Sequence, residues 1–241
     1  MRSALIIAKR ELKSYFDSLM AYLLVIVFLG LSGFFTWLFG SNIFFLGQAS
    51  LQVFFNVSYW SFFFFIPAIT MRLLAEEKRT GTIELLCTKA ISDTDIVVGK
   101  FLACLFLIFL SLFCTLPYYI TISYLGEVDH GAVWGGYVGI YLFSASYISV
   151  GVFASSTTNN QIIAFLLALF IAIFFQLLFS VVGQNFQGLG GRIFDYLSMG
   201  THFQSISRGV FDSRDLVYFF SIIVAGLYLS RFTLSRRIWR S

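Results

Sequence analysis

The chain has 241 residues, of which 59% are hydrophobic, 20% are aromatic and only 12% are charged. Soluble globular proteins carry about a quarter charged residues, so this chain lacks the polar side chains needed to cover a water-facing surface. A soluble enzyme, a disordered regulator and a secreted disulfide scaffold are excluded together, which leaves an integral membrane protein.

Four long runs contain no Asp, Glu, Lys, Arg or His, and they span residues 18–71, 101–126, 131–191 and 216–230. A bilayer core about 30 Å thick takes roughly 20 apolar helical residues, so the runs fit two, one, two and one crossings. Transmembrane β-strands alternate polar and apolar residues, which these runs do not. The sequence therefore predicts an all-α integral membrane protein with six transmembrane helices. They are expected near residues 19–40, 52–74, 99–125, 134–155, 161–183 and 214–233.

The basic residues are distributed unevenly between the predicted connections. Thirteen of the 16 Lys and Arg residues lie in the N-terminal segment, in the connection after the second span or in the C-terminal tail. Arg192, Arg208 and Arg214 lie on the other side. The positive-inside rule then puts both termini in the cytoplasm, which requires an even number of spans. The first apolar run has full span length and no small-residue cleavage site, so no cleavable signal peptide is expected.

Residues 1–18 form an amphipathic segment before the first span. Apolar residues recur at helical spacing from Leu5 onwards, while Lys9, Arg10 and Lys13 lie off that stripe. Such a helix lies in the membrane interface, with its Lys and Arg side chains reaching lipid phosphates. It serves either as a membrane anchor alone or as part of the working machinery.

Prolines and glycines inside the spans bear on their shape. Pro67 and Pro117 both fall within predicted spans, where proline removes a backbone hydrogen bond and kinks a helix. Neighbouring helices can satisfy the freed carbonyl, so these kinks are either hinges or fixed bends. Gly135 and Gly139 form a pattern of small residues that permits close approach of another helix.

The connection at residues 72–100 carries ten of the chain's 28 charged residues. Gly81 is expected to break the helix that leaves the membrane, and a second short helix is expected to start near Thr82. Ser92 precedes Asp95 by three residues, which is typical of a capping box at the start of the third span. The short helix has an apolar stripe at helical spacing, made by Ile83, Leu86, Cys87 and Ala90. The connection either docks into a groove on a cytoplasmic protein or is a solvated basic loop that only sets topology.

This connection resembles a known family. The signature that follows the second span of ABC-2-type transporter permeases is similar to the string Glu77-x-Arg79-x-Gly81-Thr82-x-Glu84-Leu85-Leu86, followed by Ser92 and then Gly99-Lys100. Lys89 stands where a proline is common. The start Lys9-Arg10-Glu11-Leu12 is similar to the elbow helix of that family, and residues 198–215 resemble its short gliding-motility-type members. The resemblance covers essentially the whole chain.

The resemblance implies one transmembrane domain over residues 1–241 that pairs with a second copy or a sister permease, above two cytoplasmic ABC ATPase subunits. Residues 1–18 would be the elbow helix, residues 75–98 the cytoplasmic coupling loop, and residues 184–213 short external re-entrant helices that shape an exit gate or cap the bundle. The interface with the ATPase would then be formed by Glu77, Arg79, Gly81, Thr82, Glu84, Leu85, Leu86 and Lys89.

Motifs for catalysis are missing from the sequence. The sequence does not match the P-loop pattern, because Gly99-Lys100 is followed by Phe101 and position 94 is Thr. ATP and Mg²⁺ would therefore be bound by a partner ATPase. The chain is therefore not expected to be an enzyme by itself, to hold a cofactor or metal, or to bind nucleic acid. His130 and His202 are expected to have surface or packing roles. Asn56, Pro67 and Gln176 either line a pathway or serve interhelical packing and hydrogen bonding.

The predicted spans hold no ionisable residue at mid-depth, which disfavours ion-coupled carriers and channels. The favoured function is the permease subunit of an ATP-binding-cassette exporter in the bacterial cytoplasmic membrane, driven by a separate cytoplasmic ATPase. The alternative is a non-transporting scaffold through which such an ATPase does mechanical or assembly work on envelope proteins. An uncoupled channel or membrane enzyme is disfavoured. The uncharged interior would suit lipid-like, amphipathic or polymeric cargo.

Overall fold

The computed structural model describes residues 2–39, 49–82, 91–186 and 188–236, and the regular elements among them are all helical. Six stretches of the described chain are long and apolar enough to cross a membrane, which confirms the predicted fold class and number of spans. The third begins six residues earlier than predicted, and the second extends five residues further. The crossings are Leu19–Leu38, Gln52–Arg79, Asp93–Leu125, His130–Thr157, Gln161–Asn185 and Ser213–Ser235.

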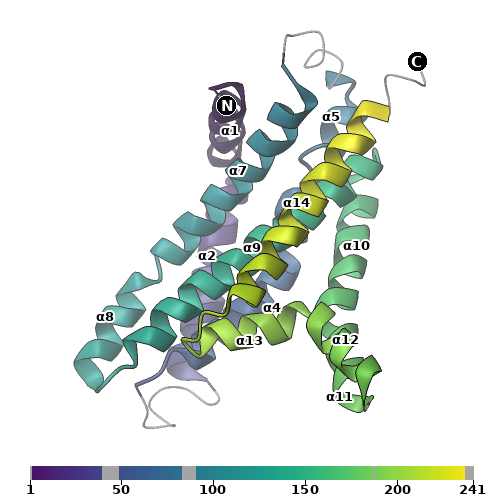
Figure 1. Cartoon of the computed structure of the whole chain (residues 1–241). Helices are drawn as coiled ribbons and strands as arrows, with labels where there is room; N and C mark the ends of the chain where they lie inside the picture. Colours follow the sequence, from purple (N-terminus) through teal and green to yellow (C-terminus); the bar gives the residue numbers. More distant parts are fainter. Residues whose placement is uncertain (1, 40–48, 83–90, 187, 237–241) are drawn as a thin grey trace.

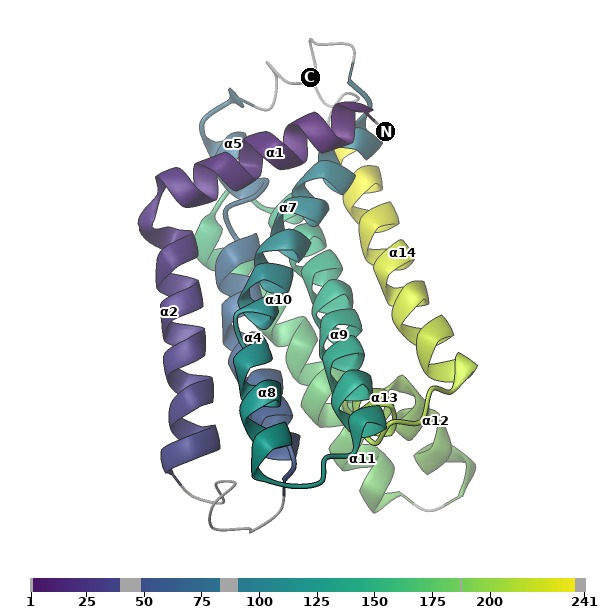
Figure 2. The same ribbon diagram turned by 90° about the vertical axis from the view of Figure 1, so that its left-hand side faces the viewer.

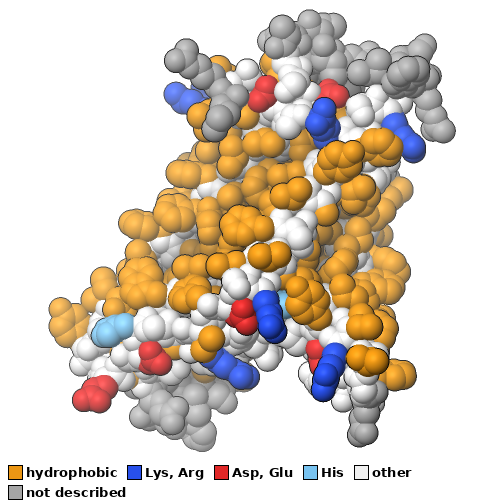
Figure 3. Space-filling model, in the orientation of Figure 1, with side chains coloured by type: hydrophobic (Ala, Val, Ile, Leu, Met, Phe, Trp, Pro, Cys, Tyr) orange, Lys and Arg blue, Asp and Glu red, His pale blue; other side chains and the backbone are white. Residues whose placement is uncertain are grey.

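Helix α1 (Arg2–Asp17) lies across one end of the bundle, above the crossings that run beside one another (Figures 1 and 2). The last turns of α14 (Ser213–Ser235) reach the same end, which we call the α1 end. The opposite end carries the short helix α13 (Met199–Ser207), and we call it the α13 end. Between them, Figure 3 shows a wide band of apolar side chains, with charged side chains gathered towards the two ends. This distribution fits a chain surrounded by lipid at its waist.

The second crossing consists of α4 (Gln52–Thr70), a turn, and the short helix α5 (Ala75–Arg79). Pro67 lies inside α4 and cannot donate to the carbonyl of Phe63, four residues earlier. The Tyr147 hydroxyl donates to that carbonyl at 2.9 Å. A side chain of a neighbouring crossing therefore satisfies the group that proline frees, as the sequence predicted.

The third crossing is broken into α7 (Asp93–Phe113) and α8 (Leu116–Leu125). Ser92 caps α7 as predicted, because its hydroxyl oxygen accepts the Asp95 N–H at 3.1 Å. Pro117 lies in the first turn of α8, where a missing N–H costs nothing. It thus begins a new helix instead of kinking a continuous one.

Helix α9 (His130–Thr157) is the most enclosed crossing, because 78% of its most apolar stretch is buried inside the protein. Small residues let its neighbours approach closely. A Cβ on Gly226 of α14 would lie 2.6 Å from the Ser149 hydroxyl oxygen, and one on Gly135 would lie 2.5 Å from the Ile206 carbonyl oxygen. The predicted small-residue pattern at the start of this helix therefore packs against α13 of the same chain.

The remaining crossings contain π-helical segments. The first consists of α2 (Leu19–Gly33) and η1 (Phe34–Leu38). The fifth consists of α10 (Gln161–Ala172), η2 (Ile173–Leu178) and α11 (Phe179–Asn185). Helix α12 (Leu189–Leu197) and α13 then precede the last crossing, so the segment predicted to hold short helices does hold two. The first, fifth and sixth crossings are only 28%, 22% and 22% buried, which leaves wide apolar faces for lipid or another membrane protein.

Candidate functional site

Helix α1 is held tightly against the bundle at the α1 end. A Cβ on Gly99 of α7 would lie 2.8 Å from the Ala4 carbonyl oxygen, so only glycine allows this approach. The buried Tyr15 hydroxyl donates to the Ile69 carbonyl of α4 at 3.1 Å. Burial raises the pKa of Tyr15 well above its ordinary value, which keeps the hydroxyl protonated as a donor. Helix α1 is therefore fixed to both the second and third crossings.

Four charged side chains meet beneath α1, and we call them the Lys100 cluster: Arg10, Glu11, Glu77 and Lys100. Lys100 of α7 is only 1% exposed, and its ammonium group lies 2.9 Å from Glu77 Oε1 and 3.2 Å from Glu11 Oε1. The Arg10 guanidinium lies 2.8 Å from the same Glu11 oxygen and 3.2 Å from the same Glu77 oxygen. A buried cation requires such partners, because an unpaired charge is costly away from water. The cluster thereby joins α1, α5 and α7.

The cluster determines how Glu11 is charged. Burial acts to raise the pKa of Glu11, but attraction to Lys100 and hydrogen bonds from Arg10 and Lys100 outweigh it. The pKa of Glu11 is therefore lowered from its ordinary value, and the carboxylate stays ionised at neutral pH. The cluster thus brings two basic side chains together with two acidic ones.

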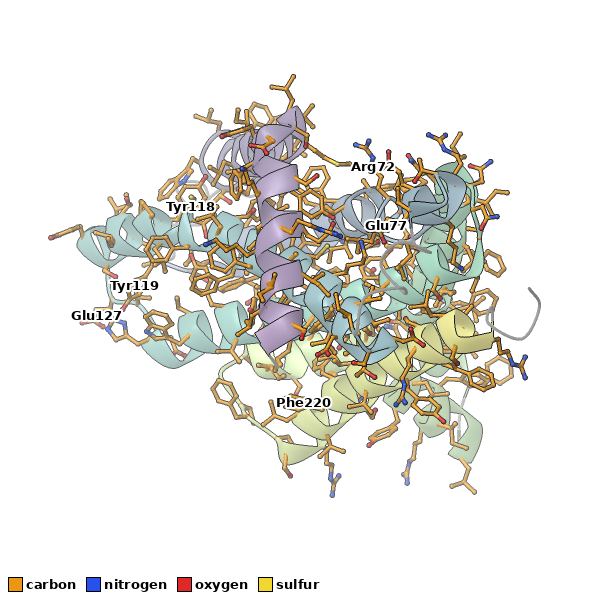
Figure 4. All side chains as sticks on the ribbon, turned by 90° about the horizontal axis from the view of Figure 1, so that it is seen from above. Arg72, Glu77, Tyr118, Tyr119, Glu127 and Phe220 are labelled. Carbon is orange, nitrogen blue, oxygen red and sulfur yellow. The ribbon has the colours of Figure 1, made fainter. Side chains whose placement is uncertain are left out.

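A cavity of about 660 Å³ lies beside the cluster. Arg72 also lines it and forms an ion pair with Glu76 at 3.0 Å. Viewed from the α1 end, Arg72 and Glu77 lie on the same side of α1 (Figure 4). The lining mixes both signs of charge with hydroxyl groups, so the cavity suits polar or charged contacts more than an apolar ligand. Its lining comprises Arg10, Glu11, Ser14, Tyr15, Ser18, Met20, Arg72, Leu73, Glu76, Glu77, Thr80, Thr82 and Lys100.

Hydrogen bonds from α9 fix the turn between α4 and α5 in place. The Ser155 hydroxyl oxygen accepts the N–H groups of Leu74 at 3.0 Å and Ala75 at 3.1 Å, and the hydroxyl donates to the Met71 carbonyl at 3.1 Å. The Lys78 ammonium group also donates to the Ser156 carbonyl. These bonds satisfy backbone donors that the start of α5 leaves open, and they fix α5 to the fourth crossing.

The chain turns directly after α5, as the sequence predicted. Gly81 has a φ of 72°, in the left-handed region that favours glycine. The Thr80 hydroxyl donates to the Glu76 carbonyl at 2.9 Å and lies 3.0 Å from the Thr82 hydroxyl. The turn therefore ends α5 with its own hydrogen bonds.

The residues predicted for the ATPase interface divide into three groups. Arg79, Gly81 and Thr82 are exposed at the α1 end. Glu77 instead points inward to the Lys100 cluster, a role that its position in the motif did not indicate. The other four lie outside the described residues, so the predicted coupling helix stays a prediction: Glu84, Leu85, Leu86 and Lys89.

The residues predicted to line a pathway do not form one group. Asn56 is exposed, whereas Pro67 is buried about 16 Å further along α4. Gln176 is 3% exposed and lies in the π-helical segment η2, facing the Tyr59 hydroxyl of α4. Among the described residues, neither amide atom of Gln176 makes a hydrogen bond of ordinary geometry. Gln176 is thus the member of this group that a polar ligand or water could still satisfy.

The sequence did not reveal a buried pair at the α13 end. His202 Nδ1 lies 2.6 Å from Asp215 Oδ1, and His202 Nε2 lies 2.8 Å from the Tyr196 carbonyl oxygen. The Tyr218 ring stacks on the imidazole with centroids 4.0 Å apart. The pair joins α13 to the start of α14. A signal was present, because His202 adjoins the apolar Phe203 and Asp215 opens an apolar span.

The described residues contain no group of three or more His, Cys, Asp or Glu side chains arranged to hold a metal ion. The fold and this charge distribution define a multi-pass helical membrane protein. The family model for ABC-2 family transporter proteins matches residues 5–215, and the chain belongs to this family. It is thus an ABC-2-type permease, as the motif after the second span indicated, while the likeness to gliding-motility-type members is not tested by this match. No curated protein matches the chain.

Proposed function

We propose that the chain is the permease subunit of an ATP-driven exporter and takes its energy from two separate cytoplasmic ABC ATPase subunits. Membership of the ABC-2 family supports an ATPase partner, and the sequence itself has no P-loop. ATP and Mg²⁺ would be bound by that partner. In this proposal the permease pairs with a second copy or a sister permease through apolar faces such as those of the first and fifth crossings.

The α1 end is the side on which the ATPase would dock. Of the described residues, Arg10, Lys78, Arg79 and Lys100 lie there, and helix α14 ends there, whereas Arg208 is at the other end. The positive-inside rule then assigns this end to the cytoplasm, in a bacterial inner membrane. Both termini would be cytoplasmic.

The Lys100 cluster is the observation that carries the coupling proposal. Glu77 lies in α5, directly before the segment that joins the second and third crossings. Its carboxylate contacts Lys100 of α7 and Arg10 of α1. A displacement of that segment by an ATPase would therefore move α1 and α7 with it. A loosely solvated loop would absorb the same displacement.

The test is co-purification with candidate ABC ATPases from the same cell, followed by measurement of stimulated ATP hydrolysis. Leu86→Asp and Glu84→Arg should lower the stimulation several-fold while membrane insertion stays intact, because both change the proposed docking surface. Arg208→Glu, at the opposite end, is the matched control and should leave it unchanged. Full stimulation with both docking variants would show that the ATPase contacts another surface.

Reconstituted vesicles then separate an exporter from a scaffold. An exporter moves amphipathic or polymeric cargo across the bilayer only when ATP is present. ATP hydrolysis that depends on the permease, without any cargo movement, would favour mechanical work on envelope proteins instead.

A further inference from the structure

Helices α7 and α9 run beneath α1 (Figure 2), and a groove lies between them. It consists of two hollows of about 490 and 390 Å³, and the ring pair Phe109 and Tyr141 lines both. The first hollow is roofed by α1 through Leu5, Ala8 and Lys9. Apart from Lys9 and the tyrosine hydroxyls, the described residues that line the groove are apolar.

The length of the groove matches one leaflet of a bilayer. It follows α7 from Leu102 to Phe113, which at 1.5 Å per residue is about 16 Å. Half of a hydrocarbon core about 30 Å thick is about 15 Å. An acyl chain that starts under α1 would therefore lie in the groove over its whole length.

Lys9 supplies a charge at the head of the groove. It is the one charged side chain among the described residues that line either hollow, and it is exposed. Its neighbour Arg10 is paired with Glu11 and Glu77, whereas Lys9 has no acidic partner in the described part of the chain. Lys13 lies one helical turn further on, also exposed. A free ammonium group in the interface attracts a phosphate.

We propose that this groove binds one anionic phospholipid from the leaflet at the α1 end, with its phosphate at Lys9 and an acyl chain along α7 and α9. An extended peptide at this depth would leave backbone groups unsatisfied in lipid, whereas an acyl chain has none. The bound lipid would hold α1 against α7 and so stabilise the position of α1, the helix that carries Arg10 and Glu11. The site does not depend on the ATPase.

Native mass spectrometry of the purified permease tests the site with phosphatidylglycerol and phosphatidylcholine as probes. The wild type should retain one phosphatidylglycerol in preference to phosphatidylcholine. Lys9→Gln should weaken retention of phosphatidylglycerol about fivefold, because it removes one ammonium group from the interface. Arg231→Gln is the matched control, since Arg231 is an exposed cation on α14 that does not line the groove.

Filling the groove gives a second variant that leaves every charge in place. Leu105→Trp should weaken retention of both lipids, whereas Val224→Trp on the exposed face of α14 should not. Equal retention of the two lipids by the wild type, no effect of Lys9→Gln, or no effect of Leu105→Trp would each overturn the proposal. A mass spectrum in which the wild type carries no lipid would do so as well, whether the permease is a monomer or a dimer.

Discussion

The two ends of the molecule hold their titratable side chains in different ways. At the α1 end, Lys100 and Arg10 share the carboxylates of Glu11 and Glu77, and residues far apart in the sequence meet beside a cavity. At the α13 end, His202 and Asp215 form a single enclosed contact. Shared carboxylates can exchange partners as helices shift, whereas one enclosed pair must break before its helices separate. We call the Lys100 cluster the adaptable joint, because its ion pairs can exchange while α1 stays packed on α7, and we call the His202–Asp215 pair the fixed joint.

Lys100→Met tests the adaptable joint and should have the largest effect. It leaves two carboxylates facing each other with Arg10 alone between them, and breaking a buried ion pair costs about 3–5 kcal/mol. The free energy of unfolding, measured by chemical denaturation in detergent, should fall by about the lower of these values, since both carboxylates keep some exposure. Lys13→Met removes an exposed cation and is the control. Equal stability of the two variants would mean that the cluster does not hold α1 in place.

Asp215→Ala tests the fixed joint, with a smaller loss expected. The buried imidazole of His202 would lose its carboxylate partner, at a cost of about 2 kcal/mol. Asp215→Asn keeps polar atoms that can pair with Nδ1 and should cost less. Glu127→Ala, an exposed acid at the same end, is the control. A loss as small as that of the control would show that the Tyr196 carbonyl and the Tyr218 ring hold the imidazole without Asp215.

ATPase stimulation per folded molecule separates the two joints further. On the proposed function, Lys100→Met should lower it, because the root of the connecting segment is no longer tied to α7. Asp215→Ala should leave ATPase stimulation unchanged, since the His202–Asp215 pair lies at the end away from the ATPase. Equal losses would show that the difference between the ends is one of stability only.

The pH dependence of stability gives the smallest expected effect. The folded pKa of Glu11 is lowered, so its contribution is fully present above its unfolded pKa of about 4.3. The contribution is lost as the pH falls through the folded pKa. The difference in melting temperature between the wild type and Glu11→Gln should therefore shrink below about pH 4. A difference that stays constant on acidification would contradict the ionised state of Glu11 in the cluster.

Much of the fold could be predicted from the sequence because lipid imposes simple rules. Charge-free runs indicated all six crossings, and local chemistry indicated the cap at Ser92 and the turn at Gly81. The π-helical segments could not be foreseen. Both segments are almost wholly apolar, so the shift in facing that a wider turn causes leaves no mark on the sequence pattern. Pro117 allowed either a kink or a new start, and only packing decides between them.

The candidate site was predicted less well. Glu77 was recognised by its motif, but its direction depends on Glu11 and Lys100, which are distant in the sequence and meet only through packing. Helical periodicity tells which face of one helix is buried, not which charges from three elements converge. The pair at the α13 end was missed for the same reason.

The hydroxyl of Ser155 has a mechanical consequence. It makes hydrogen bonds to three main-chain groups in the turn between α4 and α5, those of Met71, Leu74 and Ala75, and it belongs to α9, the most buried crossing. A displacement of the segment between the second and third crossings would therefore reach α9 directly, in addition to α1 and α7, which it reaches through Glu77. On the proposed function, each cycle of ATP hydrolysis would thus act on the most buried helix of the bundle as well as on the peripheral helix α1.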